Sequence, residues 1–393
     1  MLLSVALIIL VGMSAGWIMK KIKLPGLVGM LLTGILLGPY VLDLIDPTIL
    51  NISADIRKIA LIIILTRAGL GLDLRKLKSV GRSALMMCFV PATLEFLGVL
   101  LLGPWLLHLS YLESAILGAV LAAVSPAVVV PRMVKLMEEG YGTDKGIPEM
   151  ILAGASVDDV YVIVLFTTFT GIASGGTASV LSFINIPVSV ILGILAGVLL
   201  GFLFAKFFAK VHMRDTAKVA VVLSVSFLLT VAESALKTPI TFSALIGIMF
   251  IGVALRKFKK DTADKLSEKY GKMWVVAEVF LFVLVGATVD IKQLTNVGAM
   301  AVLLLIGALA FRMLGVFLCV LGTKLSWKER LFTMLAYTPK ATVQAAIGGI
   351  PLAMGLSAGH TILIVAVLAI VITAPLGAFA MDLTYKRLLK NEV

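Results

Sequence analysis

Charged residues are scarce in this chain. Aspartate, glutamate, lysine and arginine make up 14% of its 393 residues, whereas hydrophobic residues make up 60%. A soluble protein of this length needs a charged surface, so the composition excludes an ordinary soluble fold and favours an integral membrane protein. No long polar domain or low-complexity segment interrupts the apolar runs. The first apolar run has no basic segment before it, so we expect a retained membrane span rather than a cleaved signal peptide.

Cysteine and histidine are also rare. The two cysteines, Cys88 and Cys319, fall inside apolar runs, and the three histidines are scattered. A thiol in such a run behaves as a small hydrophobic group, so we expect neither a disulfide nor a zinc site, and no cofactor. The formal net charge of +12 could suggest nucleic acid. The basic residues are instead placed as expected for membrane topology, so we expect no nucleic-acid partner.

Long apolar windows predict an all-α membrane protein with about thirteen transmembrane helices. The expected helices span residues 2–19, 26–42, 52–72, 79–107, 112–138, 148–174, 182–210, 217–234, 240–256, 272–289, 296–323, 328–353 and 359–386. Most of the 34 lysines and arginines lie in the connections after odd-numbered helices and in the C-terminal tail. By the positive-inside rule, the N-terminus lies outside and the C-terminus lies in the cytoplasm of a cell (inner) membrane. The basic cluster 256–260 is then a cytoplasmic loop that can lie near anionic lipid.

A short internal repeat aligns residues 71–81 with residues 288–298. The two copies are separated by an odd number of helices, so they have opposite topology, which is typical of the inverted repeats of secondary transporters. The same offset pairs Glu95 with Arg312, both inside apolar helices. Equivalent positions near a two-fold axis lie close together, so the repeat predicts an ion pair. Its role is either a structural brace or a part in gating or ion selectivity.

Two of the expected helices contain proline in their middle. Pro126 and Pro131 lie in helix 112–138, and Pro339 lies in helix 328–353 at the equivalent place in the second repeat. Proline removes a backbone donor and blocks the preceding turn, so we expect both helices to be broken. Broken helices leave carbonyl groups and half-helix ends free in the middle of the membrane, where they can bind a small ion.

The helix that spans residues 148–174 carries two adjacent carboxylates, Asp158 and Asp159. A carboxylate in lipid costs at least a few kcal/mol, so it nearly always faces a partner or a polar cavity. Lys340 is an equally isolated cation and is the obvious partner. Adjacent helical residues point about 100° apart. One aspartate can therefore pair with Lys340 while the other faces the ion, and the spacing leaves open which one does so.

These residues lie in stretches that resemble the sodium/proton antiporters of the monovalent cation/proton antiporter superfamily, and most closely the NHA-type branch. The stretches are 125–131, 140–148, 156–159 and 339–348. The resemblance runs from about the third expected helix to the last. One departure from the family pattern is Val157, where animal members carry a bulkier aromatic residue. This difference leaves the selectivity among the transported cations open.

The resemblance implies an NhaA-type fold with two inverted repeats, two crossed discontinuous helices and a homodimeric assembly in the lipid bilayer. Residues 1–78 and 217–290 would form a dimerisation domain. Residues 79–174 and 291–393 would form the ion-transport core, with 182–210 as the linker helix. The core would move as an elevator against the dimerisation domain.

The resemblance also assigns roles. Asp159 would carry sodium, lithium or a proton, Asp158 would pair with Lys340, and Ser125 would contribute to the ion site. Asp158 is also a possible sodium ligand. Further residues that match family positions are the charged pair Glu95 and Arg312, and Pro126, Pro131, Pro339, Thr342 and Gln344 of the discontinuous helices.

The expected mechanism is competition between sodium and a proton for Asp159, because burial disfavours the bare carboxylate. Release of a proton from Lys340, when sodium displaces the lysine from Asp158, would make the exchange electrogenic.

Potassium/proton exchange and a sodium-coupled organic solute carrier of the same fold remain open as alternative functions. An intramembrane aspartyl protease is disfavoured because it needs its two carboxylates on separate helices. An ion channel is disfavoured because broken helices with a Lys–Asp contact suggest an occluded ion. The expectation is therefore a transporter, not an enzyme.

Overall fold

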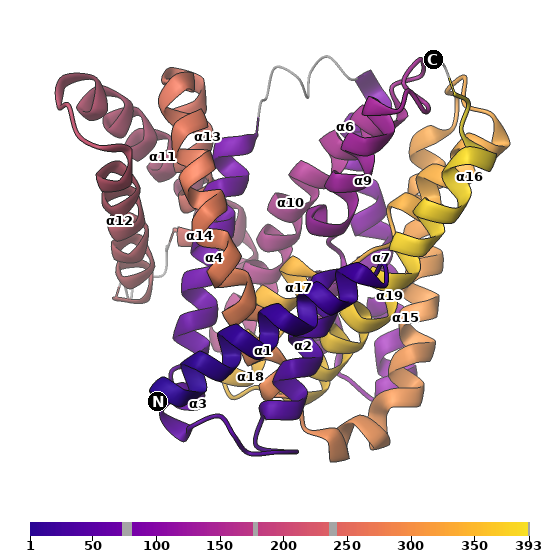
Figure 1. Ribbon diagram of the computed structural model, residues 1–393, viewed down its shortest axis with the longest axis horizontal. Coiled ribbons are helices and arrows are strands. Elements are labelled where there is room, and N and C mark those ends of the chain that lie inside the picture. Colours follow the sequence, from indigo (N-terminus) through magenta and orange to yellow (C-terminus); the bar gives the residue numbers. More distant parts are fainter. Residues whose placement is uncertain (73–80, 176–179, 236–241, 392–393) are drawn as a thin grey trace. The chain divides into compact units, whose positions relative to one another are not determined.

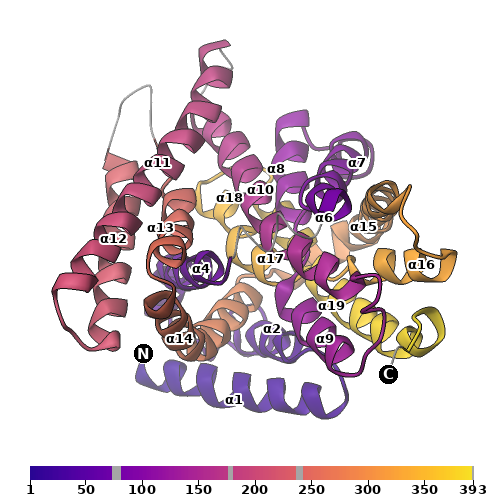
Figure 2. The ribbon, with the colours of Figure 1, turned by 90° about the horizontal axis from the view of Figure 1, so that it is seen from above.

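The computed structural model describes residues 1–72, 81–175, 180–235 and 242–391. These residues are helical throughout apart from connections and one isolated bridge between Tyr141 and Asn391. The helices, labelled in Figures 1 and 2, are α1 (Leu2–Lys21), α2 (Gly26–Leu37), α3 (Pro47–Asn51), α4 (Ser53–Gly71), α6 (Gly81–Met87), α7 (Val90–Leu107), α8 (Tyr111–Leu121), α9 (Pro126–Glu138), α10 (Ile147–Gly175), α11 (Val180–Lys210), α12 (Asp215–Ala235), α13 (Ala244–Phe258), α14 (Lys260–Ala287), α15 (Ile291–Val320), α16 (Trp327–Ala336), α17 (Thr342–Ile347), α18 (Ile350–Ala353) and α19 (Gly359–Leu388).

Within the described residues, nine helical segments are long and apolar enough to cross a membrane. They are Leu2–Lys21, Gly81–Leu107, Tyr111–Glu138, Ile147–Ser174, Val188–Lys210, Asp215–Glu233, Lys260–Ala287, Val297–Val320 and Gly359–Leu388. Gly26–Leu37 and Thr342–Ala353 are shorter apolar helices. The protein is therefore a multi-pass membrane protein. The second expected helix is shorter than predicted, because Pro39 forces the residue before it, Gly38, into an extended conformation that ends the helix at Leu37.

Both proline-containing helices are broken, as predicted. The first consists of α8 and α9, which are separated by residues 122–125, and the second consists of α16 and α17, separated by residues 337–341. Their first halves begin alike. Ser110 and Glu113 form a capping box at α8, and Ser326 and Glu329 form one at α16. Each box satisfies two backbone donors that would otherwise be unpaired at the helix start.

The chain divides into two compact units. One comprises Met1–Arg57, Arg75–Val162 and Val279–Val393, and within it α7 packs along α15, α1 along α2 and α16 along α19. The other comprises Lys58–Leu74 and Ile163–Glu278, and within it α11 packs along α13. Glycines of α11 make that contact close, because a Cβ on Gly193 would lie 2.5 Å from the carbonyl oxygen of Ser243.

Most of the first copy of the predicted repeat, residues 73–80, lies outside the described residues. In the second copy, Asp290 caps the start of α15 by accepting a hydrogen bond from the backbone N–H of Lys292, at 2.9 Å. The cap fixes where α15 begins, and α15 carries one of the buried charged residues described below.

Candidate functional site

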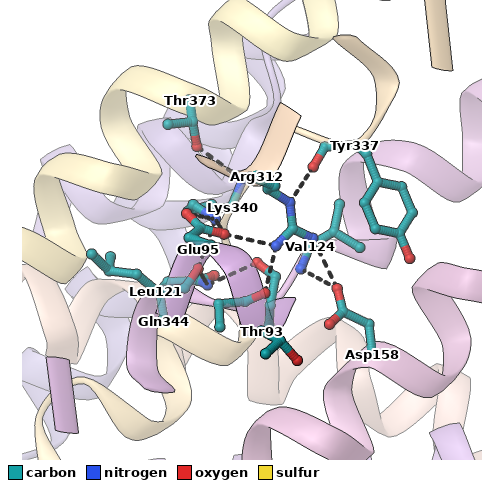
Figure 3. A network of polar contacts seen from close by, with 12 residues as sticks. Thr93, Glu95, Leu121, Val124, Asp158, Arg312, Tyr337, Lys340, Gln344 and Thr373 are labelled. Carbon is teal, nitrogen blue, oxygen red and sulfur yellow. Dashed lines mark hydrogen bonds and ion pairs between the residues drawn. The ribbon is translucent and has the colours of Figure 1, made fainter. Parts of the chain in front are cut away.

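Four buried charged side chains meet beside the two helix breaks (Figure 3). Glu95 comes from α7, Arg312 from α15, Asp158 from α10, and Lys340 from the break between α16 and α17. Each has a solvent exposure of 0%. Charges this deeply buried are stable only when they are paired, so the contacts among these side chains determine which of them can bind an ion.

Glu95 is shared by two cations. Its Oε2 accepts a hydrogen bond from Nη1 of Arg312 at 2.7 Å. The ammonium of Lys340 lies 2.7 Å from Oε1 and 2.8 Å from Oε2. The ion pair predicted between Glu95 and Arg312 is therefore present, but Glu95 is also the counter-charge of Lys340.

The predicted pairing of Asp158 with Lys340 is wrong. Oδ2 of Asp158 instead accepts hydrogen bonds from Nη2 of Arg312 and from the backbone N–H of Val124, each at 2.9 Å. The physical reason is the shape of arginine. Its planar fork of N–H donors can bridge two carboxylates at once, so Arg312 joins Glu95 to Asp158 (Figure 3). Glu95–Arg312 and Asp158–Lys340 are therefore not the two separate pairs expected from the sequence, because Arg312 bridges both carboxylates.

The carbonyl groups at the end of α8 are occupied by side-chain donors. Lys340 donates to Leu121 O at 2.6 Å, and Arg312 donates to Ala122 O at 2.5 Å. Nε2 of Gln344 lies 3.1 Å from Val120 O and 3.0 Å from Ala123 O. The expectation that this break leaves its carbonyls free for an ion is therefore wrong for these four groups.

Gln344 is a buried polar residue whose contacts the sequence did not reveal. It is fully buried, and its amide holds the unwound end of α8. The two breaks also bond directly, because the backbone N–H of Ser125 donates to Pro339 O at 2.8 Å. The sequence predicts Gln344 on the second discontinuous helix, and the structure shows that its side chain reaches the backbone at the end of the first.

Asp159 is the carboxylate that remains. It is 8% exposed, and within the described part of the chain its Oδ1 is buried without a hydrogen-bond partner. Glu95 and Asp158 balance Arg312 and Lys340, so no cation of the cluster is left to balance Asp159. Spacing alone left open which aspartate is free, and the contacts select Asp159.

Other buried oxygen atoms of this region have no hydrogen-bond partner among the described residues. They are Asp158 Oδ1, Ser125 Oγ, Gln344 Oε1 and Glu95 Oε1, the last of which lies 2.7 Å from the ammonium of Lys340. Buried polar atoms without partners are rare in folded proteins and call for an explanation such as a bound ion. Carboxylate, hydroxyl and amide oxygens are the ligands that hard cations prefer. The residues present therefore fit a small cation rather than a thiol-seeking metal.

The remaining predicted residues shape the two breaks. Ser125 is the N-cap position of α9, Pro126 is at its start and Pro131 lies inside it. Pro339 packs against Gly377 of α19, where a Cβ would lie 2.5 Å from the proline ring. Thr342 begins α17 and is 5% exposed. These residues position the breaks.

Comparison with known proteins identifies the family. The family model described as "Sodium/hydrogen exchanger, transmembrane" matches residues 5–382, nearly the whole chain. The chain belongs to this sodium/hydrogen exchanger family. The family consists of membrane transporters, not enzymes, and lies within the monovalent cation/proton antiporter superfamily that the sequence motifs indicated.

Two curated members of the exchanger family illustrate the likeness. "Sodium/hydrogen exchanger 9B2" of Homo sapiens is 34% identical over 386 residues, covering 94% of this chain and 70% of that protein. "Sodium/hydrogen exchanger 9B1" of Homo sapiens is 33% identical over 395 residues, covering 93% and 73%. Among solved structures, the sodium proton antiporter MjNhaP1 from Methanocaldococcus jannaschii superposes with a TM-score of 0.84 at 23% identity, covering 98% of this chain and 97% of that chain. At that identity the structural match shows a shared fold.

Proposed function

We propose that this protein exchanges sodium or lithium ions for protons across the membrane, and that the two ions compete for Asp159. The observation that carries this proposal is the charge balance of the site. Asp159 is the carboxylate without a positive partner in the described cluster, and its Oδ1 is buried and unpaired. The names of the relatives, sodium/hydrogen exchangers, support the choice of ions.

Competition follows from burial. A bare carboxylate in a closed, dry site is costly, so Asp159 must hold either a proton or a cation whenever the site is closed. Asp158 Oδ1 and Ser125 Oγ can supply further oxygen ligands to the cation. If the site closes only when Asp159 is neutralised, one ion can enter only after the other has left. Exchange is then coupled without any covalent chemistry.

The proposed exchange is one sodium ion for one proton and moves no net charge. This differs from the electrogenic exchange expected from the sequence, which required sodium to displace Lys340 from Asp158, because Lys340 is held by Glu95 at 2.7 Å. Two carboxylates offset two cations in the cluster, so the loaded site has the same charge with sodium as with a proton. The exchange rate should therefore be unchanged by a clamped membrane potential.

We infer the finer architecture from the same resemblance. The chain would cross the membrane thirteen times with the N-terminus outside, as two inverted repeats of the NhaA type. Residues 1–78 and 217–290 would form the dimerisation domain of a homodimer. Residues 79–174 and 291–393 would form a core that moves as an elevator, with 182–210 as linker. The similar fold of MjNhaP1 and the matching capping boxes of α8 and α16 support this inference.

The test uses purified protein in liposomes, where proton movement is recorded under sodium, lithium or potassium gradients with the membrane potential clamped or free. Sodium and lithium gradients should drive protons at the same rate in both conditions, and Asp159→Asn should abolish the flux. Asp264→Asn, an exposed carboxylate that pairs with Arg256, is the matched control and should retain it. Sodium-driven flux that survives in Asp159→Asn would remove the carrier assignment, and flux driven by potassium alone would favour potassium/proton exchange.

A further inference from the structure

Lys145, in the loop between α9 and α10, is a charged residue that the proposed ion site does not use. The loop turns sharply at Gly140, Gly142 and Gly146, whose φ values are 72°, 68° and 61°. Its lysine reaches the start of the second broken helix, where the ammonium lies 2.7 Å from Oε2 and 3.0 Å from Oε1 of Glu329. The Glu329 side chain is 2% exposed, so water screens this ion pair only weakly.

A matching contact lies at the start of the first broken helix. Oγ of Ser357, in the connection between α18 and α19, donates to Oε1 of Glu113 at 2.6 Å. Glu113 and Glu329 are the glutamates of the two capping boxes, so each contact acts on the first turn of a broken helix. The start of each broken helix is therefore held by the loop that follows the other. We call Lys145–Glu329 and Ser357–Glu113 the two end clamps.

The two broken helices are thus joined at both ends as well as in the middle, and all the residues involved belong to one compact unit. In the middle, the backbone N–H of Ser125 donates to Pro339 O at 2.8 Å. The half-helices α8 and α16 have 11 and 10 residues. Each is therefore only about 15 Å long, from its clamp to its break. Because the backbone of a break has no helical hydrogen bonds of its own, its place depends on where the half-helix before it is held.

We propose that Lys145 and Ser357 are positioning residues of the ion site. Through α16 and α8 they set the places of Lys340 and Ser125 at the two breaks. The proposal rests on the proposed antiport, since it gives the two clamps a part in sodium affinity. In the predicted topology, the lysine clamp is cytoplasmic and the serine clamp is external, so each side of the membrane has one.

The two clamps differ in strength. Lys145 neutralises a buried carboxylate, and its loss leaves that charge with hydrogen bonds from Ser326 alone. Ser357 binds a carboxylate at the surface, where water can replace the hydroxyl. Removing Lys145 should therefore displace the breaks more than removing Ser357.

The first test needs no transport, because hydrogen exchange followed by mass spectrometry reports how firmly the backbone amides of a break are held. The acceptor of the Ser125 amide is Pro339 O, at the end of α16. Lys145→Met should therefore speed exchange in peptides that cover residues 122–129 several-fold. Lys145→Arg keeps the ion pair and should restore the protection.

The matched control is Lys272→Met, which breaks an exposed pair with Glu268, 2.8 Å long, within a single helix. It removes the same charge and should leave exchange at the break unchanged. Faster exchange in Lys145→Met that is confined to residues 143–149 and 326–332 would show that the clamp acts only locally. That result would overturn the proposal.

The second test measures sodium-driven proton exchange in liposomes. Lys145→Met should raise the KM for sodium several-fold and change the maximal rate less, and Lys145→Arg should keep the wild-type KM. Ser357→Ala should shift the KM in the same direction by a smaller factor, and it serves both tests if Lys145→Met does not fold. An unchanged KM in these variants would overturn the positioning role, since a purely structural brace lowers only the amount of folded protein. A wild-type protein that moves no protons under a sodium gradient would refute the antiport, and the exchange measurement would still decide whether the clamps hold the breaks.

Discussion

At the scale of single residues, the site is a line of alternating charges that ends in an unpaired carboxylate. Lys340, Glu95, Arg312 and Asp158 follow one another through direct contacts of 2.7 to 2.9 Å. A buried line of this kind is stable because each charge has an opposite neighbour. The next residue along α10, Asp159, has no such neighbour within the cluster, and this difference is why the transporting role is proposed for Asp159 rather than for Asp158.

Removing one charge of the line should lower the free energy of unfolding more than removing two charges that pair with each other. Glu95→Gln leaves Lys340 without a counter-charge, so we expect a loss of about 3–5 kcal/mol in the free energy of unfolding. Glu95→Gln combined with Lys340→Met removes both charges and should be more stable than Glu95→Gln alone. Thermal unfolding of the purified variants measures this coupling. Losses that simply add in the double variant would show that the two side chains do not depend on each other.

The sequence revealed the identity of the charged residues better than their contacts. All five charges could be found because each interrupts an apolar helix, and the repeat placed Glu95 beside Arg312. Which cation serves which carboxylate depends on side-chain directions after the two breaks have folded. No spacing rule gives those directions, so the contacts of Lys340 and Gln344 could not be predicted.

At the scale of the helices, proline and glycine set the geometry. Pro126 and Pro339 predicted both breaks correctly, because a missing N–H acts locally and is visible in the sequence. Which donors bind the freed carbonyl groups depends on residues far away in the sequence, since the donors come from α15 and from the other broken helix. The breaks were therefore predictable, whereas the occupation of their carbonyl groups was not.

The glycines at positions 34 and 38 allow close packing between α2 and α14. A Cβ on Gly34 would overlap the carbonyl oxygen of Val283 in α14, and one on Gly38 would lie 2.9 Å from Ala287. Gly34→Ala should therefore force α2 away from α14 and lower the free energy of unfolding by about 1–3 kcal/mol. Gly171→Ala in α10, which has open space around it, should be neutral or slightly stabilising. Equal Tm values for the two alanine variants would contradict this close packing.

At the scale of the whole molecule, composition and hydropathy were sufficient to predict a helical membrane protein, and the resemblance of its motifs to cation/proton antiporters predicted a transporter. The family match over residues 5–382 and the superposition on MjNhaP1 agree with that prediction. Hydropathy predicted the lengths of individual helices less reliably, since α2, α13 and α17 are too short to span a membrane. Short and broken helices are found where neighbouring protein, rather than lipid, satisfies the backbone.

In the proposed mechanism, sodium and a proton occupy the same carboxylate, Asp159. The most direct measurement is the number of protons released for each sodium ion bound, obtained by titrating the purified protein with sodium in a weakly buffered solution. We predict a release that approaches one proton per sodium ion at a pH where Asp159 is protonated before sodium is added, and no release from Asp159→Asn. Sodium binding without proton release at every pH, or unchanged release from Asp159→Asn, would contradict the account.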